Sequence, residues 1–223
     1  MRKINKNCAS FIAQASHDLR QPLQALMIYL DLFDVSELSV KQKKLWEKIV
    51  TTTENLNFLL GSILDFSKIE FGNVKVNKQE VNMEILLNNL FYEYDTLAKI
   101  KKIEFQYNVC KAKIISDGVL IERILRNLLS NAFKFTKNKV NVFCKEEKDC
   151  IKIIVSDNGK GIKKEEQKNI FDEYYQGDNV CAFNNGVGLG LSIVKKITSK
   201  LNADIEVISA LGMGSKFILT LRK

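Results

Sequence analysis

Ile153-Ile-Val-Ser-Asp157-Asn-Gly159-Lys-Gly161-Ile162 reads as a strand that runs into a glycine turn. The β-branched residues at 153–155 predict a buried strand. A carboxylate at the end of such a strand, here Asp157, can accept a hydrogen bond from an exocyclic amine such as that of adenine. Glycines at 159 and 161 would let the backbone approach a bound ring. An ordinary turn would use the same residues, so both interpretations stay open at this point.

The segment before this strand is a predicted helix over residues 118–134. It carries Asn127 and Asn131 four residues apart, on one face, with Lys134 close to one turn further on. Amide oxygens can ligate Mg²⁺, and an ammonium group can neutralise phosphate oxygens. A plain polar stripe on an amphipathic helix would show the same spacing, so this pattern alone does not decide between them.

A second glycine-rich segment follows the strand. It reads Asn184-Asn-Gly186-Val-Gly188-Leu-Gly190-Leu191 and opens a predicted helix over 188–201. Glycines at a helix N-terminus present free N–H groups and the positive end of the helix dipole to a phosphate. The motif follows a polar loop and not a strand, which argues against a dinucleotide site of the Rossmann type.

The pattern around these motifs predicts an α+β sandwich in which helices cover one face of a mixed sheet. The short linker 146–149 between two of the strands favours an antiparallel hairpin. The expected helices span 82–99, 118–134, 163–170 and 188–201. The expected strands span 74–77, 103–107, 113–116, 140–145, 151–155, 204–208 and 216–221.

The first 71 residues have a different, helical period. Apolar positions from Leu45 to Phe66 recur in steps of four and three, and Ser39 with Gln42 forms a capping-box pattern at the start of this helix. An earlier series from Cys8 to Phe33 predicts the other helix of a hairpin. Both helices carry more than one apolar stripe, so we expect two hairpins to pair into a four-helix bundle in a homodimer. The alternative is a hairpin that packs on its own C-terminal domain. The predicted domains are 1–71 and 72–223.

Composition limits the class of protein. The chain has 223 residues, 46% hydrophobic and 27% charged, which excludes disorder and fibrous structure. No apolar run approaches the roughly 20 residues of a membrane span, and the N-terminus lacks the apolar core of a signal peptide. The net charge of +8 agrees with an anionic ligand or simply with a lysine-rich surface. No aromatic and basic groove or recognition motif predicts nucleic-acid binding.

The five cysteines contain no CxxC pair, and the single histidine leaves no ligand set for zinc. We therefore expect buried free thiols in a reducing compartment, and a cytoplasmic protein.

The single histidine, His17, lies on the predicted first helix, roughly 190° away from the direction of its apolar seam. It should therefore face solvent. Asp18 follows it and can accept a proton from one ring nitrogen, which leaves the other as a nucleophile. Pro22 removes a hydrogen bond to the carbonyl of Asp18 and should kink the helix there. A lone surface histidine is the alternative.

Taken together, five ordered motifs resemble those of sensor histidine kinases. Residues 16–23 (Ser-His-Asp-Leu-Arg-Gln-Pro-Leu) resemble the H-box, and 127–136 resemble the N-box. Residues 157–161, 171–176 and 186–190 resemble the G1 box, the F-box and the G2 box, and 210–217 resemble the family's last turn and strand. The resemblance covers nearly the whole chain.

The resemblance implies a Bergerat-type ATP fold that binds ATP and Mg²⁺. It implies that Asn131 ligates Mg²⁺, that Asn127 and Lys134 lie near the phosphates, and that Phe135 and Asp157 contact the adenine. It implies a further set of ATP-binding residues: Gly159, Gly161, Ile162, Gly186, Gly188, Leu189, Gly190 and Leu191.

The resemblance also implies a reaction. His17 accepts the phosphoryl group from ATP with Asp18 as base, and passes it to an aspartate of a response-regulator receiver domain. ATPases that share the fold carry a glutamate where this chain has Asn127, an amide that cannot take a proton from water, so ATP hydrolysis should be slow. The chain is then either a short kinase or the cytoplasmic core of a larger, membrane-bound or hybrid kinase. A non-catalytic dimeric scaffold that binds the receiver is the alternative.

Overall fold

The structure is a computed structural model, and it describes residues 19, 21–70, 74–176 and 188–223. The chain divides into two compact units. One contains the chain up to Val74 together with Asp178–Leu189, and the other contains Lys75–Gly177 and Gly190–Lys223. Among the described residues, no helix combines the length and the apolar character that crossing a membrane requires.

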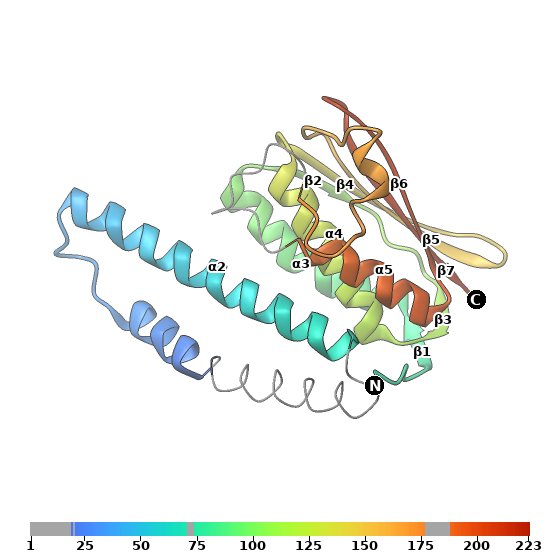
Figure 1. The fold of residues 1–223 in the computed structure, drawn as a ribbon, viewed down its shortest axis with the longest axis horizontal. Helices are drawn as coiled ribbons and strands as arrows, with labels where there is room; N and C mark the ends of the chain where they lie inside the picture. The colour runs from blue at the N-terminus through green and yellow to red at the C-terminus, as the bar shows by residue number, and fades with distance from the viewer. Residues whose placement is uncertain (1–18, 20, 71–73, 177–187) are drawn as a thin grey trace. The chain divides into compact units, whose positions relative to one another are not determined.

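The first unit contains a helical hairpin, as the sequence predicts. A helix over residues 21–32 is followed by a turn and by helix α2 (Val40–Glu70) (Figure 1). The predicted capping box is present: the Ser39 N–H donates to Gln42 Oε1 at 2.9 Å, and the Gln42 N–H reaches Ser39 Oγ at 3.4 Å. Phe33 stacks on Trp46 with ring centroids 4.4 Å apart, which joins the turn to α2. The predicted end of the hairpin at 71–73 lies outside the described residues.

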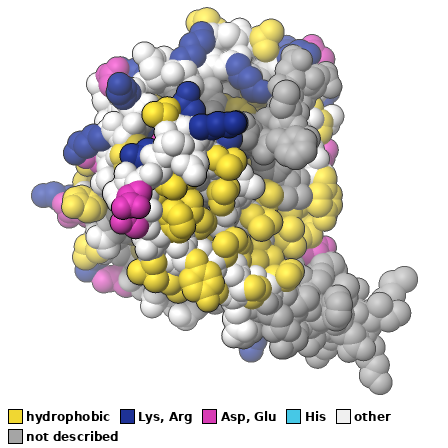
Figure 2. Space-filling model, turned by 90° about the vertical axis from the view of Figure 1, so that its left-hand side faces the viewer, with side chains coloured by type: hydrophobic (Ala, Val, Ile, Leu, Met, Phe, Trp, Pro, Cys, Tyr) yellow, Lys and Arg dark blue, Asp and Glu magenta, His cyan; other side chains and the backbone are white. Residues whose placement is uncertain are grey.

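The apolar seam of α2 is largely uncovered in the single chain. Four of its six apolar positions, Leu45, Ile49, Leu56 and Ile63, are exposed by 42–59%. Figure 2 shows hydrophobic side chains, in yellow, that are open to solvent on one face of the molecule. Exposed apolar stripes of this kind mark surfaces that pack against another molecule.

The second unit is built on a five-stranded mixed sheet with the order β2-β4-β5-β7-β6. Its strands are β2 (Glu104–Tyr107), β4 (Lys139–Glu146), β5 (Cys150–Asp157), β6 (Asp204–Ala210) and β7 (Gly214–Arg222). β2 pairs with β4 in parallel and all other pairs are antiparallel. The predicted hairpin of β4 and β5 is therefore confirmed.

Three helices cover one face of this sheet (Figure 1). They are α3 (Met83–Lys101) against β2, α4 (Gly118–Phe135) against β5, and α5 (Gly190–Leu201) against β6. Side chains alternate along β4 and β5, so that one set faces the helices and is buried. The core between sheet and helices contains Val140, Val142, Ile151, Ile153, Val155, Leu219, Ile124, Leu125, Leu128, Val194 and Ile197. The α+β sandwich is therefore confirmed.

Two predicted elements are wrong. Residues 74–77 form no strand; the strand β1 lies at Gln79–Asn82, where it pairs with β3 (Lys113–Ser116) in a small separate sheet. The partner strand decides this: β3 pairs with Gln79–Asn82, where Val81 opposes Ile114, and none of the described strands pairs with residues 74–77. The helix expected at 163–170 is only one 3₁₀ turn, Glu166–Lys168, because its highly charged sequence has no apolar stripe to bury.

The expectation of free thiols is wrong for two cysteines, since Cys110 and Cys144 form a disulfide. The parallel pairing of β2 with β4 continues past Tyr107, where the Asn108 N–H donates to the Val142 carbonyl at 3.1 Å. This alignment brings the two Cα atoms within 5.5 Å, although the cysteines are 34 residues apart in sequence. Cys150 is free and half-buried. Cys8 and Cys181 lie outside the described residues.

Candidate nucleotide site

Helix α4 carries the first group of predicted site residues. Asp117 caps its N-terminus, accepting the Leu120 N–H at 3.1 Å, and the same carboxylate accepts the Asn77 N–H at 2.9 Å. The apolar face of α4 is buried against the core, so its polar side is left half-open. Asn127 and Asn131 are half-buried on that side and Lys134 is exposed. A strongly amphipathic helix thus holds three polar groups at the boundary between core and solvent.

The amide of Asn127 has a defined orientation. Its Nδ2 donates to the Arg123 carbonyl one turn earlier at 2.8 Å, so its Oδ1 points away from that bond. A Cβ atom at Gly190 would lie 3.1 Å from this oxygen. The first residue of α5 and the amide oxygen of α4 therefore approach closely, and a larger residue at 190 would crowd the oxygen.

Asp157 ends β5 with a carboxylate that is already engaged. Its Oδ1 accepts the Gly159 N–H at 2.7 Å, and the Ser215 N–H also donates to the carboxylate. Burial raises the pKa of Asp157, and these two hydrogen bonds lower it in part. The half-buried carboxylate of Asp157 can still accept further hydrogen bonds. A neutral amine donor would suit it, because the amine would replace hydrogen bonds to water that the carboxylate loses on burial.

Two glycines of the predicted turn are required by close packing. A Cβ at Gly159 would collide with the carbonyl oxygen of Phe135, the last residue of α4. Gly161 has a φ of +70°, and a Cβ there would collide with the carbonyl oxygen of Ala210. The turn is therefore packed tightly between the end of α4 and the β6–β7 turn. Any residue with a side chain at position 159 or 161 would force the backbone to move.

The next residue of this loop is fixed by hydrogen bonds. The Ile162 N–H donates to Ser209 Oγ at 2.9 Å, and Gln167 Nε2 donates to the carbonyls of Ile162 at 3.0 Å and Ser209 at 2.8 Å. The loop after β5 is thus anchored at both of its ends.

Two ammonium groups lie beside Phe135. The Nζ atoms of Lys134 and Lys160 are 5.2 and 5.0 Å from the centroid of its ring. Partial desolvation and the nearby charge of Lys160 lower the pKa of Lys134 to about 8. Among the described residues neither ammonium has a carboxylate partner in an ion pair. The pair is therefore suited to a polyanion.

The remaining predicted residues are placed in part. Gly188 has a φ of +75°, Leu189 is buried, and Leu191 is half-buried in the first turn of α5, which begins at Gly190. Gly186 lies outside the described residues, and so do His17 and Asp18.

Three residues beside the predicted site were not singled out from sequence. Lys160 and Asn158 lie inside the glycine turn, and Thr136 follows Phe135. Asn158 accepts a hydrogen bond from Thr136 Oγ1 at 2.9 Å. All three lie within the N-box-like and G1-box-like segments, and this position could have drawn attention to them. Spacing in sequence does not show, however, that the end of α4 and the turn after β5 are in contact.

The residues present would suit a magnesium ion that is bound mainly through the phosphates of a ligand. No group of three or more metal-ligating His, Cys, Asp or Glu side chains exists among the described residues. Mg²⁺ commonly keeps several waters and binds through one or two protein oxygens plus substrate phosphates. The half-buried amide of Asn131 can supply one such oxygen.

Comparison with known proteins gives two family matches. Residues 116–223 match the family described as histidine kinase-, DNA gyrase B- and HSP90-like ATPase, and residues 9–72 match the His Kinase A (phospho-acceptor) domain. The autoinducer 2 sensor kinase/phosphatase LuxQ of Vibrio vulnificus is 33% identical over 227 residues, which cover 97% of this chain and 26% of that protein. The sensor histidine kinase RcsC of Escherichia coli K12 is 34% identical over 224 residues, 96% of this chain and 23% of RcsC. The chain thus spans about a quarter of the length of these relatives.

Two solved structures share the fold. Full-length ShkA in complex with AMPPNP superposes with a TM-score of 0.74 at 23% identity, over 95% of this chain and 45% of ShkA. The histidine kinase AdeS of Acinetobacter baumannii gives a TM-score of 0.65 at 19% identity, over 92% of this chain and 97% of that one. At these identities the similarity concerns the fold alone.

Proposed function

Because the chain belongs to the sensor histidine kinases, we propose that it transfers the γ-phosphoryl group of ATP to His17 and then to an aspartate of a receiver domain. The observation that carries this proposal is the meeting of three motifs in the second unit. Asn127 on α4 approaches Gly190 at the start of α5, and the turn after Asp157 packs on the carbonyl of Phe135. These contacts form a frame in which an adenine and a polyphosphate can be held at once.

The adenine end of the site is formed by Asp157 and Phe135. The Asp157 carboxylate accepts a hydrogen bond from the exocyclic amine, and the ring of Phe135 provides an apolar surface for the base. Guanine carries an oxygen in place of that amine, which would face the carboxylate as a second acceptor. The site therefore selects ATP over GTP.

The phosphate end is formed by α4 and the first turn of α5. Lys134 offsets phosphate charge, and the N-terminus of α5 at Gly190 offers backbone N–H groups. Gly186, Gly188 and Leu189 precede that N-terminus, and we assign them to the loop that encloses the phosphates. A bound Mg²⁺, held by Asn131 and the phosphates, would neutralise charge on the transferring group.

The amide of Asn127, in place of a glutamate, favours transfer to His17 over hydrolysis. Asn127 is an amide and cannot take a proton from water, so hydrolysis is disfavoured. One ring nitrogen of His17 attacks the γ-phosphorus in line, its bond to phosphorus forms as the bond to the ADP oxygen breaks, and Asp18 accepts the proton from the other ring nitrogen. The phosphohistidine then donates its phosphoryl group to the carboxylate of the receiver aspartate.

The exposed seam of α2 supports a homodimer in which two hairpins form a four-helix bundle. Leu45, Ile49, Leu56 and Ile63 would be covered by the partner hairpin. Because the relatives are about four times longer, we assign the chain to the cytoplasmic core of a larger kinase, where ATP is available.

The test is incubation of the dimeric chain with γ-labelled ATP and Mg²⁺, comparing wild type with His17→Gln and Asn131→Asp. We expect acid-labile, alkali-stable label on the wild type and none on His17→Gln. Asn131→Asp should label far more weakly, because the changed ligand disturbs metal and phosphate placement. A His17→Gln protein that gained acid-labile label at the wild-type rate would refute the assignment of the phosphate acceptor.

A further inference from the structure

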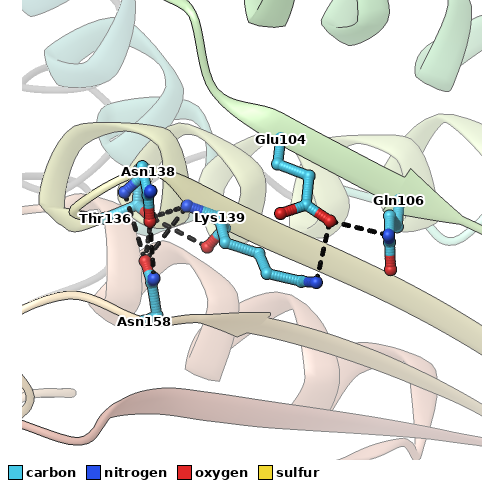
Figure 3. A network of polar contacts seen from close by, with 6 residues as sticks. All are labelled: Glu104, Gln106, Thr136, Asn138, Lys139 and Asn158. Carbon is cyan, nitrogen blue, oxygen red and sulfur yellow. Dashed lines mark hydrogen bonds and ion pairs between the residues drawn. The ribbon is translucent and has the colours of Figure 1, made fainter.

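Asn158 is the centre of a network of polar contacts between three segments of the second unit (Figure 3). Its Oδ1 accepts three hydrogen bonds: from Thr136 Oγ1 at 2.9 Å, from the Asn138 N–H at 3.2 Å and from the Lys139 N–H at 3.0 Å. Its Nδ2 donates to Asn138 Oδ1 at 2.7 Å. Its backbone N–H donates to the Lys139 carbonyl at 3.2 Å. Both ends of this amide are therefore used.

The network connects the two halves of the adenine end. Thr136 is the C-cap of α4 and directly follows Phe135, and Lys139 is the first residue of β4. Asn158 itself stands between Asp157 and Gly159. The Thr136 hydroxyl hydrogen is shared between Asn158 Oδ1 and the Lys139 carbonyl, 2.8 Å from Oγ1, and the Lys139 N–H is shared between Asn158 Oδ1 and Thr136 Oγ1 at 3.0 Å. These shared bonds link α4 to β4.

The network extends to the edge of the sheet. Lys139 Nζ pairs with Glu104 Oε1 at 2.8 Å, and the same oxygen accepts Gln106 Nε2 at 2.7 Å (Figure 3). The Glu104 and Lys139 side chains are 53% and 35% exposed, so this outer pair contributes little. The inner amide of Asn158 is half-buried and is the part that fixes geometry.

We propose that Asn158 is a positioning residue of the nucleotide site, which holds the Asp157 carboxylate at a fixed distance from the ring of Phe135. Asn158 does not touch the base; it acts through its two neighbours and through the C-cap of α4. The inference rests on the proposed binding of ATP. Without the side-chain network, the Asn158 backbone N–H still donates to the Lys139 carbonyl. The contact of Gly159 with the Phe135 carbonyl resists closer approach of the turn to α4 but does not resist separation.

The chemistry of the network specifies its residue type. The side chain at 158 accepts from three donors with its oxygen and donates to Asn138 with its nitrogen, so alanine loses all of these side-chain bonds and keeps only the backbone N–H bond to the Lys139 carbonyl. A carboxylate at 158 still accepts the three donors, and the amide of Asn138 can turn over to donate to its second oxygen. Likewise a carboxylate at 138 still accepts from Asn158 Nδ2. Carboxylates at both positions leave no donor between them and repel each other.

The experiment measures dissociation constants for ATP·Mg²⁺ and GTP·Mg²⁺ by titration calorimetry on the full chain. For Asn158→Ala we expect the ATP dissociation constant to rise about tenfold with one site per chain, while GTP binding is unchanged, so that selectivity falls by the same factor. Asn158→Asp and Asn138→Asp should each bind ATP within about twofold of wild type. The double variant should bind as weakly as Asn158→Ala.

Asn108→Ala is the matched control. The Asn108 amide also bridges a backbone, donating to the Cys144 carbonyl at 3.2 Å and accepting its N–H at 2.7 Å, but it lies beyond β2 and outside the site. It should lower the thermal midpoint without changing ATP affinity. A general loss of folded protein would lower the number of sites and not the selectivity.

The outcomes distinguish the proposed binding of ATP from the proposed role of Asn158. A wild-type chain that binds neither nucleotide overturns the proposed function itself. A wild type that binds ATP, with Asn158→Ala equal to it in ATP affinity and selectivity, overturns only the role of Asn158, as does a double variant that binds like the single ones.

Discussion

ATP affinity should fall as the pH rises through about 8, because Lys134 loses its charge in that range. Partial desolvation, together with the charge of Lys160, lowers the pKa of Lys134 to about 8 in the free protein. Both effects disfavour the charged form, whereas a bound phosphate favours it. Binding therefore raises the pKa of Lys134, and affinity is greatest below the pKa of the free protein.

The size of the effect follows from the protonated fraction. If only the charged form binds phosphate, the apparent dissociation constant is the intrinsic one divided by that fraction. With a pKa of about 8, the fraction is about 0.9 at pH 7 and about 0.1 at pH 9. The dissociation constant should therefore rise about tenfold between these pH values, with uptake of roughly half a proton per ATP near pH 8.

Titration calorimetry in two buffers of different ionisation enthalpy measures both quantities. Lys134→Arg keeps its charge over this range and should bind with little dependence on pH and no proton uptake. Lys160→Gln removes the second cause of the shift, so the loss of affinity should move to higher pH. If wild type and Lys134→Arg showed the same dependence on pH, the reasoning about Lys134 would be refuted.

Three further changes have expected outcomes. Asp157→Asn should weaken ATP binding but raise the thermal denaturation midpoint near neutral pH, because burial disfavours the ionised carboxylate of the wild type. This gain in midpoint should shrink as the pH falls through the raised pKa of Asp157, where the wild-type carboxyl becomes neutral. A gain that stayed constant with pH would contradict this. Reduction of the Cys110–Cys144 disulfide should lower the free energy of unfolding by about 3–4 kcal/mol, measured by urea denaturation with and without reductant; equal midpoints would contradict the bond. Arg126 forms two hydrogen bonds of 2.7 and 3.0 Å to Glu93. Arg126→Met should nevertheless lower the free energy of unfolding by less than about 1 kcal/mol, because both side chains are about half exposed. A larger loss would contradict the view that solvent screens this pair.

Local signals in the sequence predict much of the fold. The Ser39 and Gln42 capping box is present as expected, and α4 and β3 lie where the apolar periods place them. β1 was not predicted, because its four residues gain their strand conformation by pairing with β3, a partner 31 or more residues away in sequence. Local propensity cannot contain that information.

The site shows the same division. Asn127, Asp157 and the glycines could be singled out from sequence because their residue types suit the binding of a nucleotide, and their roles stay predictions. The network of Asn158 could not, since it depends on the end of α4 meeting the turn after β5, and an asparagine before a glycine is also typical of an ordinary turn. The disulfide between Cys110 and Cys144 likewise depends on strand pairing that no spacing in sequence reveals.

The proposed function depends on transfer of the phosphoryl group of ATP to the imidazole of His17. Tandem mass spectrometry of the chain, digested at alkaline pH after incubation with ATP and Mg²⁺, locates the added phosphate directly. We expect phosphate on the peptide that contains His17, with the fragment masses placing it on that residue. Phosphate on a serine, threonine or aspartate instead, with an unmodified His17, would contradict it.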